Sequence, residues 1–212
     1  MNDIMAEKLK IIDKEAWTPR TSMGKLVKSG EISSVEQIFN LGKPIIEPEI
    51  IDVLIPNLES ETLEVRSTQR VTDSGKRTQF RIIVVIGDRK GHVGVGVGKC
   101  EEIKPALEFA VRDAKKNIIS ILGGCGSWEC KCQLKHSLTQ KTTGKEGSTI
   151  VTLKPAPQGL GLAASDIVKK VLSMAGIKDV WSSSFGGKNV YNMTMATIES
   201  LDNLNKLKRL KN

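Results

Sequence analysis

Three cysteines and a histidine lie close together near the middle of this chain of 212 residues. Cys125, Cys130, Cys132 and His136 offer four soft ligand atoms within twelve residues. Zinc binds four such ligands tetrahedrally, so this group is a candidate structural zinc site. Only Lys131 separates Cys130 from Cys132, which departs from the usual spacing of zinc knuckles. The alternative is a set of small buried thiols at a joint between two domains.

Two glycine-rich stretches invite comparison with phosphate-binding loops. The stretch that ends at Gly98 and Lys99 lacks the first glycine and the Ser or Thr of a P-loop. The stretch PAPQGLGLAA, from Pro155 to Ala164, resembles the phosphate loop of the galactokinase and homoserine-kinase superfamily, but Leu162 and Ala163 replace its serines. A small-molecule kinase is therefore the runner-up function. The alternative is a turn that leads into a helix N-terminus, where an anion is still favoured.

Glycine and valine alternate in the segment GDRKGHVGVGVGK, which spans Gly87 to Lys99. A strand with this pattern has one valine face and one bare glycine face. Glycine packs nothing, so we expect another group to approach the backbone closely at Gly94 and Gly96. The tight turn before the strand has Arg89 and Lys90 at its tip, which suits contact with a phosphate backbone. The alternative is a neighbouring helix packed on the glycines.

Positive charge is concentrated on the same part of the chain. The whole chain carries a formal net charge of +8 at pH 7. Residues 1–62 hold seven Lys or Arg against eleven Asp or Glu, a net of −4, whereas residues 66–99 hold eight against two, a net of +6. Such focusing is the electrostatic footprint of a nucleic-acid binder. A solvated basic face without a ligand is the alternative.

Hydrophobic periodicity predicts the elements that carry these charges. We expect strands at 62–71 and 79–87 joined by the basic turn TDSGKR, then the glycine strand, then a helix over 103–122 with an apolar stripe. Basic residues of the first strand and of the helix end, outside that stripe, are further candidate RNA contacts: Arg66, Arg70, Lys115 and Lys116.

The remaining chain divides around this unit. After the cysteines we expect strands in SLTQKTT and STIVTLKPA, a helix over 164–176, a strand in IKDVWSSS and a last helix from Tyr191 to Leu210. Before it we expect short helices around 5–15 and from Ser33 to Asn40, with prolines keeping the rest irregular. The predicted organisation is an extension over 1–60, a domain over 61–122, a Cys-rich joint over 123–136 and a domain over 137–212.

Several classes of protein are disfavoured. No segment reaches the roughly 18 apolar residues of a membrane span, and the start MNDIMAEKLK leads into no apolar run typical of a signal peptide. Clustered cysteines are typical of reduced thiols, which favours the cytoplasm. A cysteine nucleophile needs an activating base, and the chain has only His92 and His136 for that role.

Three segments resemble the universal small-subunit ribosomal protein S5 family. They are GDRKGHVGVGVGKCEEIKPALEFAVRDAKKN, STIVTLKPAPQGLGL and KKVLSMAGIKDVWSSSFG, in that order within residues 62–205. The segments WTPRTSMGKLVKSGEISSVEQIF and GCGSWECKC resemble the archaeal branch. The resemblance implies an α+β protein with a double-stranded-RNA-binding-like β-β-β-α domain. A β-α-β-α two-layer domain with a left-handed crossover is implied after it.

The same resemblance implies a ribosomal protein that is not an enzyme. It implies binding to small-subunit rRNA, contact with the neighbouring S4 protein, a role in decoding accuracy and a place near where mRNA enters the subunit. A protein–protein surface is implied near the turn from Thr143 to Ser148. A free RNA chaperone that uses the same basic face is a third candidate.

Carried over residue by residue, the family's RNA contacts map to Ser74, Gly75, Lys76 and Arg77 in one turn, and to Arg89, Lys90, His92, Gly94 and Gly96 in the second turn and its strand.

Overall fold

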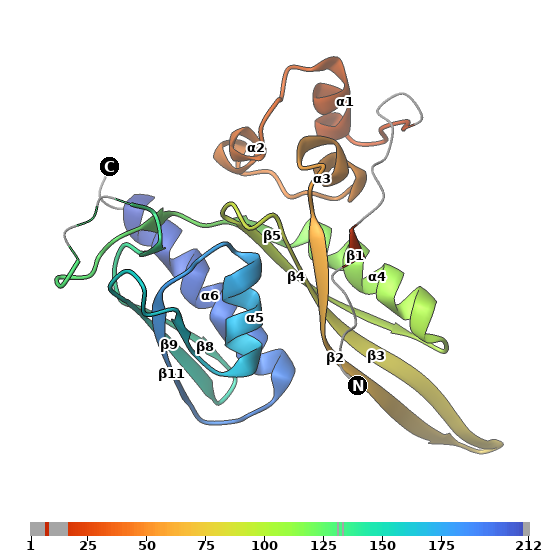
Figure 1. Cartoon of the computed structure of the whole chain (residues 1–212). Helices are drawn as coiled ribbons and strands as arrows, with labels where there is room; N and C mark the ends of the chain where they lie inside the picture. The colour runs from red at the N-terminus through yellow and green to blue at the C-terminus, as the bar shows by residue number, and fades with distance from the viewer. Residues whose placement is uncertain (1–6, 9–16, 131, 133, 210–212) are drawn as a thin grey trace. The chain divides into compact units, whose positions relative to one another are not determined.

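The structure is a computed structural model that describes residues 7–8, 17–130, 132 and 134–209. These residues form two compact units (Figure 1). The first unit comprises the described residues up to Ile86 together with Gly96–Ile118. The second comprises Gly87–Val95 and the described residues from Ile119 onward. The domain boundaries predicted from the sequence stay a prediction.

The larger sheet has five strands, which follow one another in sequence order. Its strands lie in the order β1-β2-β3-β4-β5, so each pairs with the next along the chain. The apolar run Ile82–Ile86 is buried on both faces, as expected of a central strand. The far half of the β2–β3 hairpin is exposed along its length and projects as a long arm (Figure 1). The strands are β1 (Glu7–Lys8), β2 (Glu59–Thr72), β3 (Gly75–Gly87), β4 (His92–Cys100) and β5 (Ile118–Ser120).

Helix α4 (Ile103–Lys116) follows the strands, so the predicted order of three strands and a helix is confirmed. Its alanines Ala106, Ala110 and Ala114 pack on the side chains of β3. The helix ends at Lys116, and the prediction that it continues to 122 is wrong. Ile118 keeps the helical phase of the apolar stripe, but it begins β5, where β-branched residues fit the edge of the sheet.

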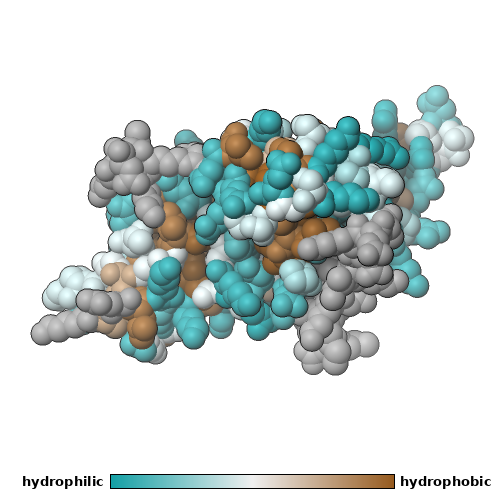
Figure 2. Space-filling model, turned by 90° about the horizontal axis from the view of Figure 1, so that it is seen from above, coloured by the Kyte–Doolittle hydropathy of each residue, from teal (hydrophilic) through white to brown (hydrophobic). Residues whose placement is uncertain are grey.

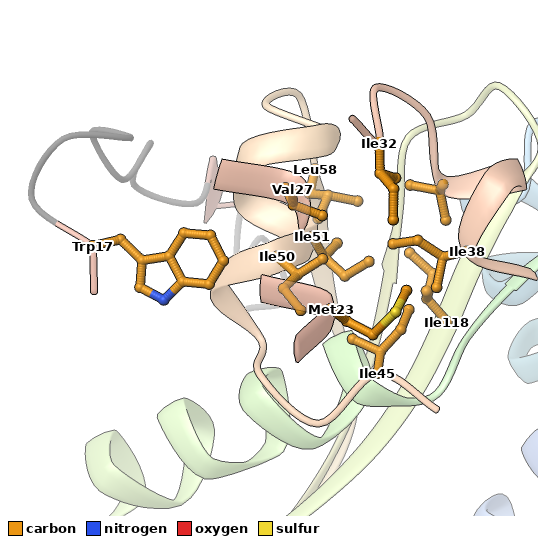
Figure 3. Close-up of a cluster of buried hydrophobic side chains, with 11 residues drawn as sticks. Trp17, Met23, Val27, Ile32, Ile38, Ile45, Ile50, Ile51, Leu58 and Ile118 are labelled. Carbon is orange, nitrogen blue, oxygen red and sulfur yellow. The ribbon is translucent and has the colours of Figure 1, made fainter. Parts of the chain in front are cut away.

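The N-terminal region forms three short helices around a hydrophobic cluster (Figure 3). They are α1 (Ser22–Ser29), α2 (Val35–Leu41) and α3 (Glu49–Leu54). Met23 and Val27 of α1 lie against Ile50 and Ile51 of α3, and Ile118 of β5 joins the same cluster. The extension is therefore anchored to the sheet by burial of apolar side chains.

The helix predictions for this region have mixed outcomes. The helix expected from Ser33 to Asn40 is confirmed as α2. The segment expected to stay irregular contains α3, because Pro48 precedes its first turn, where a proline is tolerated. The helix expected around 5–15 falls mostly outside the described residues. Glu7 and Lys8, which are described, form a strand that pairs with β2, so the prediction is wrong at these two residues.

The second unit is built on a four-stranded sheet in the order β10-β11-β9-β8. Helices α5 and α6 lie on one side of it (Figure 1). The parallel pair β10 and β11 is connected through α5, and the other neighbours are antiparallel. The predicted strands and helices are present in the predicted order, and the short strand β10 before α5 was not predicted. The elements are β8 (Thr142–Glu146), β9 (Thr149–Pro155), β10 (Leu162–Ala163), α5 (Asp166–Met174), β11 (Val180–Phe185) and α6 (Val190–Arg209).

Hydrophilic side chains predominate on the face shown in Figure 2, and hydrophobic ones form separate patches between them. Among the described helices, none combines the length and the apolar character that a bilayer crossing requires.

Candidate functional site

The first predicted RNA contact is the turn between β2 and β3. Asp73 and Ser74 form its tip, and Gly75 takes a φ of 135°, which side chains rarely adopt. The hydroxyl of Thr72 donates to the carbonyl of Gly75 at 2.9 Å and closes the turn. Every residue from Val71 to Thr78 is exposed. The turn therefore presents its backbone and its cations freely to solvent.

The cations of this hairpin differ in their local partners. The Nε of Arg77 donates to Oε1 of Glu101 at 3.0 Å, and Arg66 donates to Glu64 at 2.8 Å. Both arginines are more than half exposed, and ion pairs between exposed side chains contribute little free energy. Phosphate can therefore replace either carboxylate at small cost. Arg70 and Lys76 are exposed as well.

The second turn, between β3 and β4, is organised by Asp88. Its Oδ1 accepts the backbone N–H groups of Lys90 at 2.7 Å and His92 at 3.0 Å, and its Oδ2 lies 2.7 Å from Nδ1 of His92. Arg89 takes the left-handed conformation, with a φ of 55°. Its N–H donates to the carbonyl of Met174 at 3.0 Å. These bonds fix the backbone and leave the side chains of Arg89 and Lys90 exposed.

The charge state of Asp88 follows from the same contacts. Burial alone raises the pKa of this carboxyl, but the hydrogen bonds from His92 and from the backbone of Lys90 and His92 outweigh it, so the pKa lies below its usual value. Asp88 is thus an anion at neutral pH. Sequence reasoning missed it as a functional residue, although aspartate at the start of a turn is a known signal.

Three of the predicted RNA contacts are buried, which corrects those predictions. Gly94 and Gly96 lie inside, and a Cβ at Gly96 would overlap the backbone of Ala110 and Ala114. At Gly96 and Gly98 the group that approaches the glycine face is therefore helix α4, as the alternative interpretation held. Lys115 is 8% exposed and forms an ion pair with Asp52 of α3. It is buried because the N-terminal helices cover a wider part of α4 than the apolar stripe of that helix indicates.

His92 and Lys116 have different outcomes. His92 is partly buried and its Nδ1 is engaged by Asp88, so it shapes the turn from within. Lys116 is exposed at the end of α4 and keeps its predicted availability.

The candidate metal ligands come together in the second unit. A short antiparallel ribbon of β6 (Gly123–Gly124) and β7 (Ser137–Leu138) joins the two ends of the Cys-rich segment. Cys125 directly follows one strand and His136 directly precedes the other. One ligand atom from each of the four residues lies within 4.8 Å of the others. The grouping predicted from sequence spacing is therefore present in space.

The four donor atoms are close together, but two of the sulfurs are closer than a tetrahedral zinc site requires. Sγ of Cys130 and Sγ of Cys132 are 2.9 Å apart, and Nε2 of His136 lies 3.1 Å from Cys132 and 3.7 Å from Cys130. Tetrahedral zinc with Zn–S bonds of about 2.3 Å separates sulfurs by about 3.8 Å. The donors thus have the right chemistry, and the two neighbouring sulfurs need to separate by about an ångström to hold the ion.

The two neighbouring cysteines titrate as a pair. The hydrogen bond between their side chains lowers the pKa of Cys130 to about 6 and raises the pKa of Cys132 to about 11. One thiolate is therefore already present near neutral pH. A thiolate is the form in which cysteine binds a metal.

Asp179, just before β11, connects this cluster to the PAPQGLGL loop. Its Oδ2 lies 2.8 Å from Nδ1 of His136. Its Oδ1 accepts the N–H groups of Gly159 at 3.1 Å and Gly161 at 2.8 Å. The amides that a kinase loop would offer to phosphate are thus bound to the protein's own carboxylate. The resemblance to a kinase loop therefore carries no phosphate site.

Comparisons with known proteins show what the chain is similar to. Residues 58–122 match the family described as ribosomal protein S5, N-terminal domain, and residues 144–212 match the corresponding C-terminal domain. Proteins named small ribosomal subunit protein uS5 are similar over most of the chain. The one from Methanocaldococcus jannaschii is 50% identical over 90% of this chain and 88% of its own length. The one from Staphylothermus marinus is 50% identical over 91% of this chain and 92% of its own length. The one from Methanococcus maripaludis is 45% identical over 100% of this chain and 94% of its own length.

Proposed function

This chain belongs to the ribosomal protein S5 family, and from that premise we propose that it binds small-subunit rRNA through its two exposed basic turns. As a family member it is a structural constituent of the small ribosomal subunit in the cytoplasm, and not an enzyme. The relatives named above are archaeal, in line with the archaeal-type segments. The kinase alternative is thereby set aside.

The observation that carries the proposal is the exposure of cations at two turns whose backbones are held by hydrogen bonds. The first turn offers Lys76 and Arg77, and the second offers Arg89 and Lys90. Each backbone is fixed by local hydrogen bonds, so little backbone conformational entropy is lost when a phosphate binds. Backbone N–H groups and cations together suit phosphate contacts, which set affinity and register without reading sequence.

The family resemblance supports finer proposals for the rest of the protein. We propose a contact with the S4 protein near the β8–β9 turn, where Gly147 takes a φ of 57° and Lys145 and Ser148 are exposed. We also propose that the chain lies near where mRNA enters the subunit and contributes to decoding accuracy. The exposed β2–β3 arm is long enough to reach RNA beyond the body of its unit.

We further propose that the four ligands Cys125, Cys130, Cys132 and His136 hold a structural zinc ion. The support is the clustering of their donor atoms and the thiolate character of Cys130. When bound, the ion cross-links the Cys-rich segment and neutralises its thiolates. His136 is held in place by Asp179 in the manner common to metal-binding histidines.

Incorporation into small subunits tests the main proposal. Subunits would be reconstituted with the wild-type chain or with a variant carrying Lys76→Ala, Arg77→Ala, Arg89→Ala and Lys90→Ala, and then sedimented. We expect the variant to remain largely in the unbound fraction. Equal incorporation of both chains would refute the assignment of these turns. A wild-type chain that stays away from mature subunits would instead favour a free RNA chaperone.

A further inference from the structure

We propose that Asp179 is a positioning residue of the metal centre, and that through it metal binding sets the conformation of the loop from Pro157 to Leu162, the metal loop. This inference rests on the zinc site proposed above. It adds a coupling between that site and an exposed segment more than twenty residues away in sequence.

Asp179 holds His136 by its side chain and by its backbone. Its carboxylate lies 2.8 Å from Nδ1 of His136, and its own N–H donates to the carbonyl of His136 at 3.1 Å. Both residues are about 95% buried, at 4% and 6% exposure. A carboxylate at Nδ1 keeps the proton on that nitrogen, which leaves the lone pair of Nε2 directed at the sulfurs.

The second oxygen of the same carboxylate holds the metal loop. It accepts the N–H groups of Gly159 and Gly161, whose φ values of 90° and 76° require glycine. Gln158, Gly159 and Leu160 are exposed, so few apolar contacts hold this stretch. The carboxylate is therefore a principal tether of the loop.

A separate bond ties the loop to a metal ligand. The backbone N–H of Gln158 donates to the sulfur of Cys130. Amides at 158, 159 and 161 are thus directed at the ligand set or at the carboxylate behind it. Hydrogen bonds of this kind to metal ligands, or to the groups that hold them, orient the ligands toward a bound cation.

The coupling follows from what the metal changes. A bound cation would fix the side chains of Cys130 and His136 in place, and through His136 the carboxylate of Asp179, so the loop amides would have acceptors of fixed position. Without the cation, the side chains of His136 and Cys130 can turn. The acceptors of the loop then lose their fixed position. By linkage, a loop that favours the metal-bound arrangement also raises metal affinity.

The test uses the full-length chain with and without zinc. Elemental analysis gives the zinc content, and amide hydrogen exchange is followed at residues 157–162 before and after removal of zinc by a chelator. We expect exchange in the metal loop to rise at least tenfold on removal. Amides of α5, which lies outside the metal loop, serve as the internal reference and should keep their rates.

The variant Asp179→Asn tests the positioning role. An amide cannot favour the Nδ1 proton in the same way, so zinc affinity should fall about 10- to 100-fold in competition with a chelator. The control Asp113→Asn removes a carboxylate that accepts the N–H of Val97 in the other unit, and its zinc affinity should match wild type.

The outcomes separate the two proposals. A chain that binds no zinc overturns the zinc site, and this inference falls with it. A chain that binds one zinc, but whose metal loop exchanges equally fast in both states, overturns the coupling alone. Wild-type zinc affinity in Asp179→Asn overturns the positioning role. The exchange experiment needs no variant, so it decides the coupling even if Asp179→Asn fails to fold.

Discussion

Lys115 of α4 and Asp52 of α3 form a buried ion pair that ties the N-terminal helices to the helix beneath the sheet. Nζ of Lys115 lies 2.7 Å from one carboxylate oxygen and 2.8 Å from the other. Burial raises the pKa of Asp52, although Lys115 opposes this. A lysine that looked like an RNA contact thus serves as a structural link within the first unit.

Lys115→Ala should destabilise the protein by about 3–5 kcal/mol, because it leaves the carboxylate of Asp52 buried without its partner. The free energy of unfolding would be measured by urea denaturation. Lys116→Ala, one position away and exposed, should stay within about 0.5 kcal/mol of wild type. The double variant Lys115→Met with Asp52→Leu should recover most of the loss. Equal stability of the two single variants would contradict a buried pair.

Salt dependence should reveal the phosphate contacts of the two turns. Each phosphate neutralised contributes about 0.7–0.9 to the slope of log affinity against log salt. The quadruple alanine variant at Lys76, Arg77, Arg89 and Lys90 should therefore lower that slope by about three. Filter binding to small-subunit rRNA over a range of salt measures it.

A variant of equal net charge provides the control for the salt experiment. It changes four lysines that are exposed outside the turns, and its slope should stay close to wild type: Lys25, Lys43, Lys104 and Lys169. If the slope falls by the same amount in both variants, the salt dependence of binding comes from the total charge of the protein and not from the two turns.

Asp88→Asn should weaken the second turn in a pH-dependent way. The folded protein holds the pKa of Asp88 below its usual 3.8, so its stabilising effect is fully present above that value and is lost as pH falls through the lowered pKa. At pH 7 the variant should be less stable by about 1.5–3 kcal/mol, as for hydrogen bonds to a charged group. The difference should shrink below pH 3.8. A difference that is constant with pH would mean that the ionised carboxylate is not what stabilises the turn.

Gly96→Ala should impair folding itself. The new Cβ would overlap the backbone of α4 at Ala110 and Ala114, and overpacking of this kind costs about 1–3 kcal/mol or more. Thermal unfolding of the isolated chain measures the effect. Gly123→Ala is the matched control, since its Cβ would meet only ordinary contacts, with Lys135 at 3.5 Å. A stable Gly96→Ala chain that fails only in subunit assembly would restore the idea that RNA approaches this strand.

Purified protein should contain about one zinc ion per chain, as a four-ligand structural site requires. Cys130→Ser should lose the metal and make residues 123–136 more sensitive to protease. Cys100→Ser changes the cysteine that lies outside the cluster and should retain both the zinc and the resistance. A wild-type chain without metal, yet equally resistant, would leave the cluster as packing residues.

Sequence periodicity was sufficient for the longer elements and weakest at their ends. The apolar run of β3 and the apolar stripe of α4 were sufficient to predict a strand and a helix, because both patterns are long and regular. The end of α4 was misplaced since Ile118 fits the helical stripe as well as it fits a strand. Helix α1 went unpredicted because it lacks the capping-box spacing, Ser33 followed by Glu36, that indicated the equally short α2.

The candidate sites were predictable only where their residues are close in sequence. The four metal ligands lie within twelve residues, so their spacing alone brought them together. Asp179 lies 43 residues from His136, and only the folded chain shows that they meet. The burial of Lys115 depends on Asp52, 63 positions earlier, and no local pattern contains that information.

The ribbon of β6 and β7 has a consequence for the kinetics of metal exchange. By pinning Gly124 beside Ser137, it holds the first and last ligands near each other before an ion arrives. After one sulfur has captured zinc, the remaining donors are present at a high effective concentration, and each further bond forms within the molecule. An ion can then escape only when several bonds are open together. If zinc occupies the site as proposed, the ion should leave slowly, and the zinc content of a finished subunit should reflect the supply of metal when the protein folded.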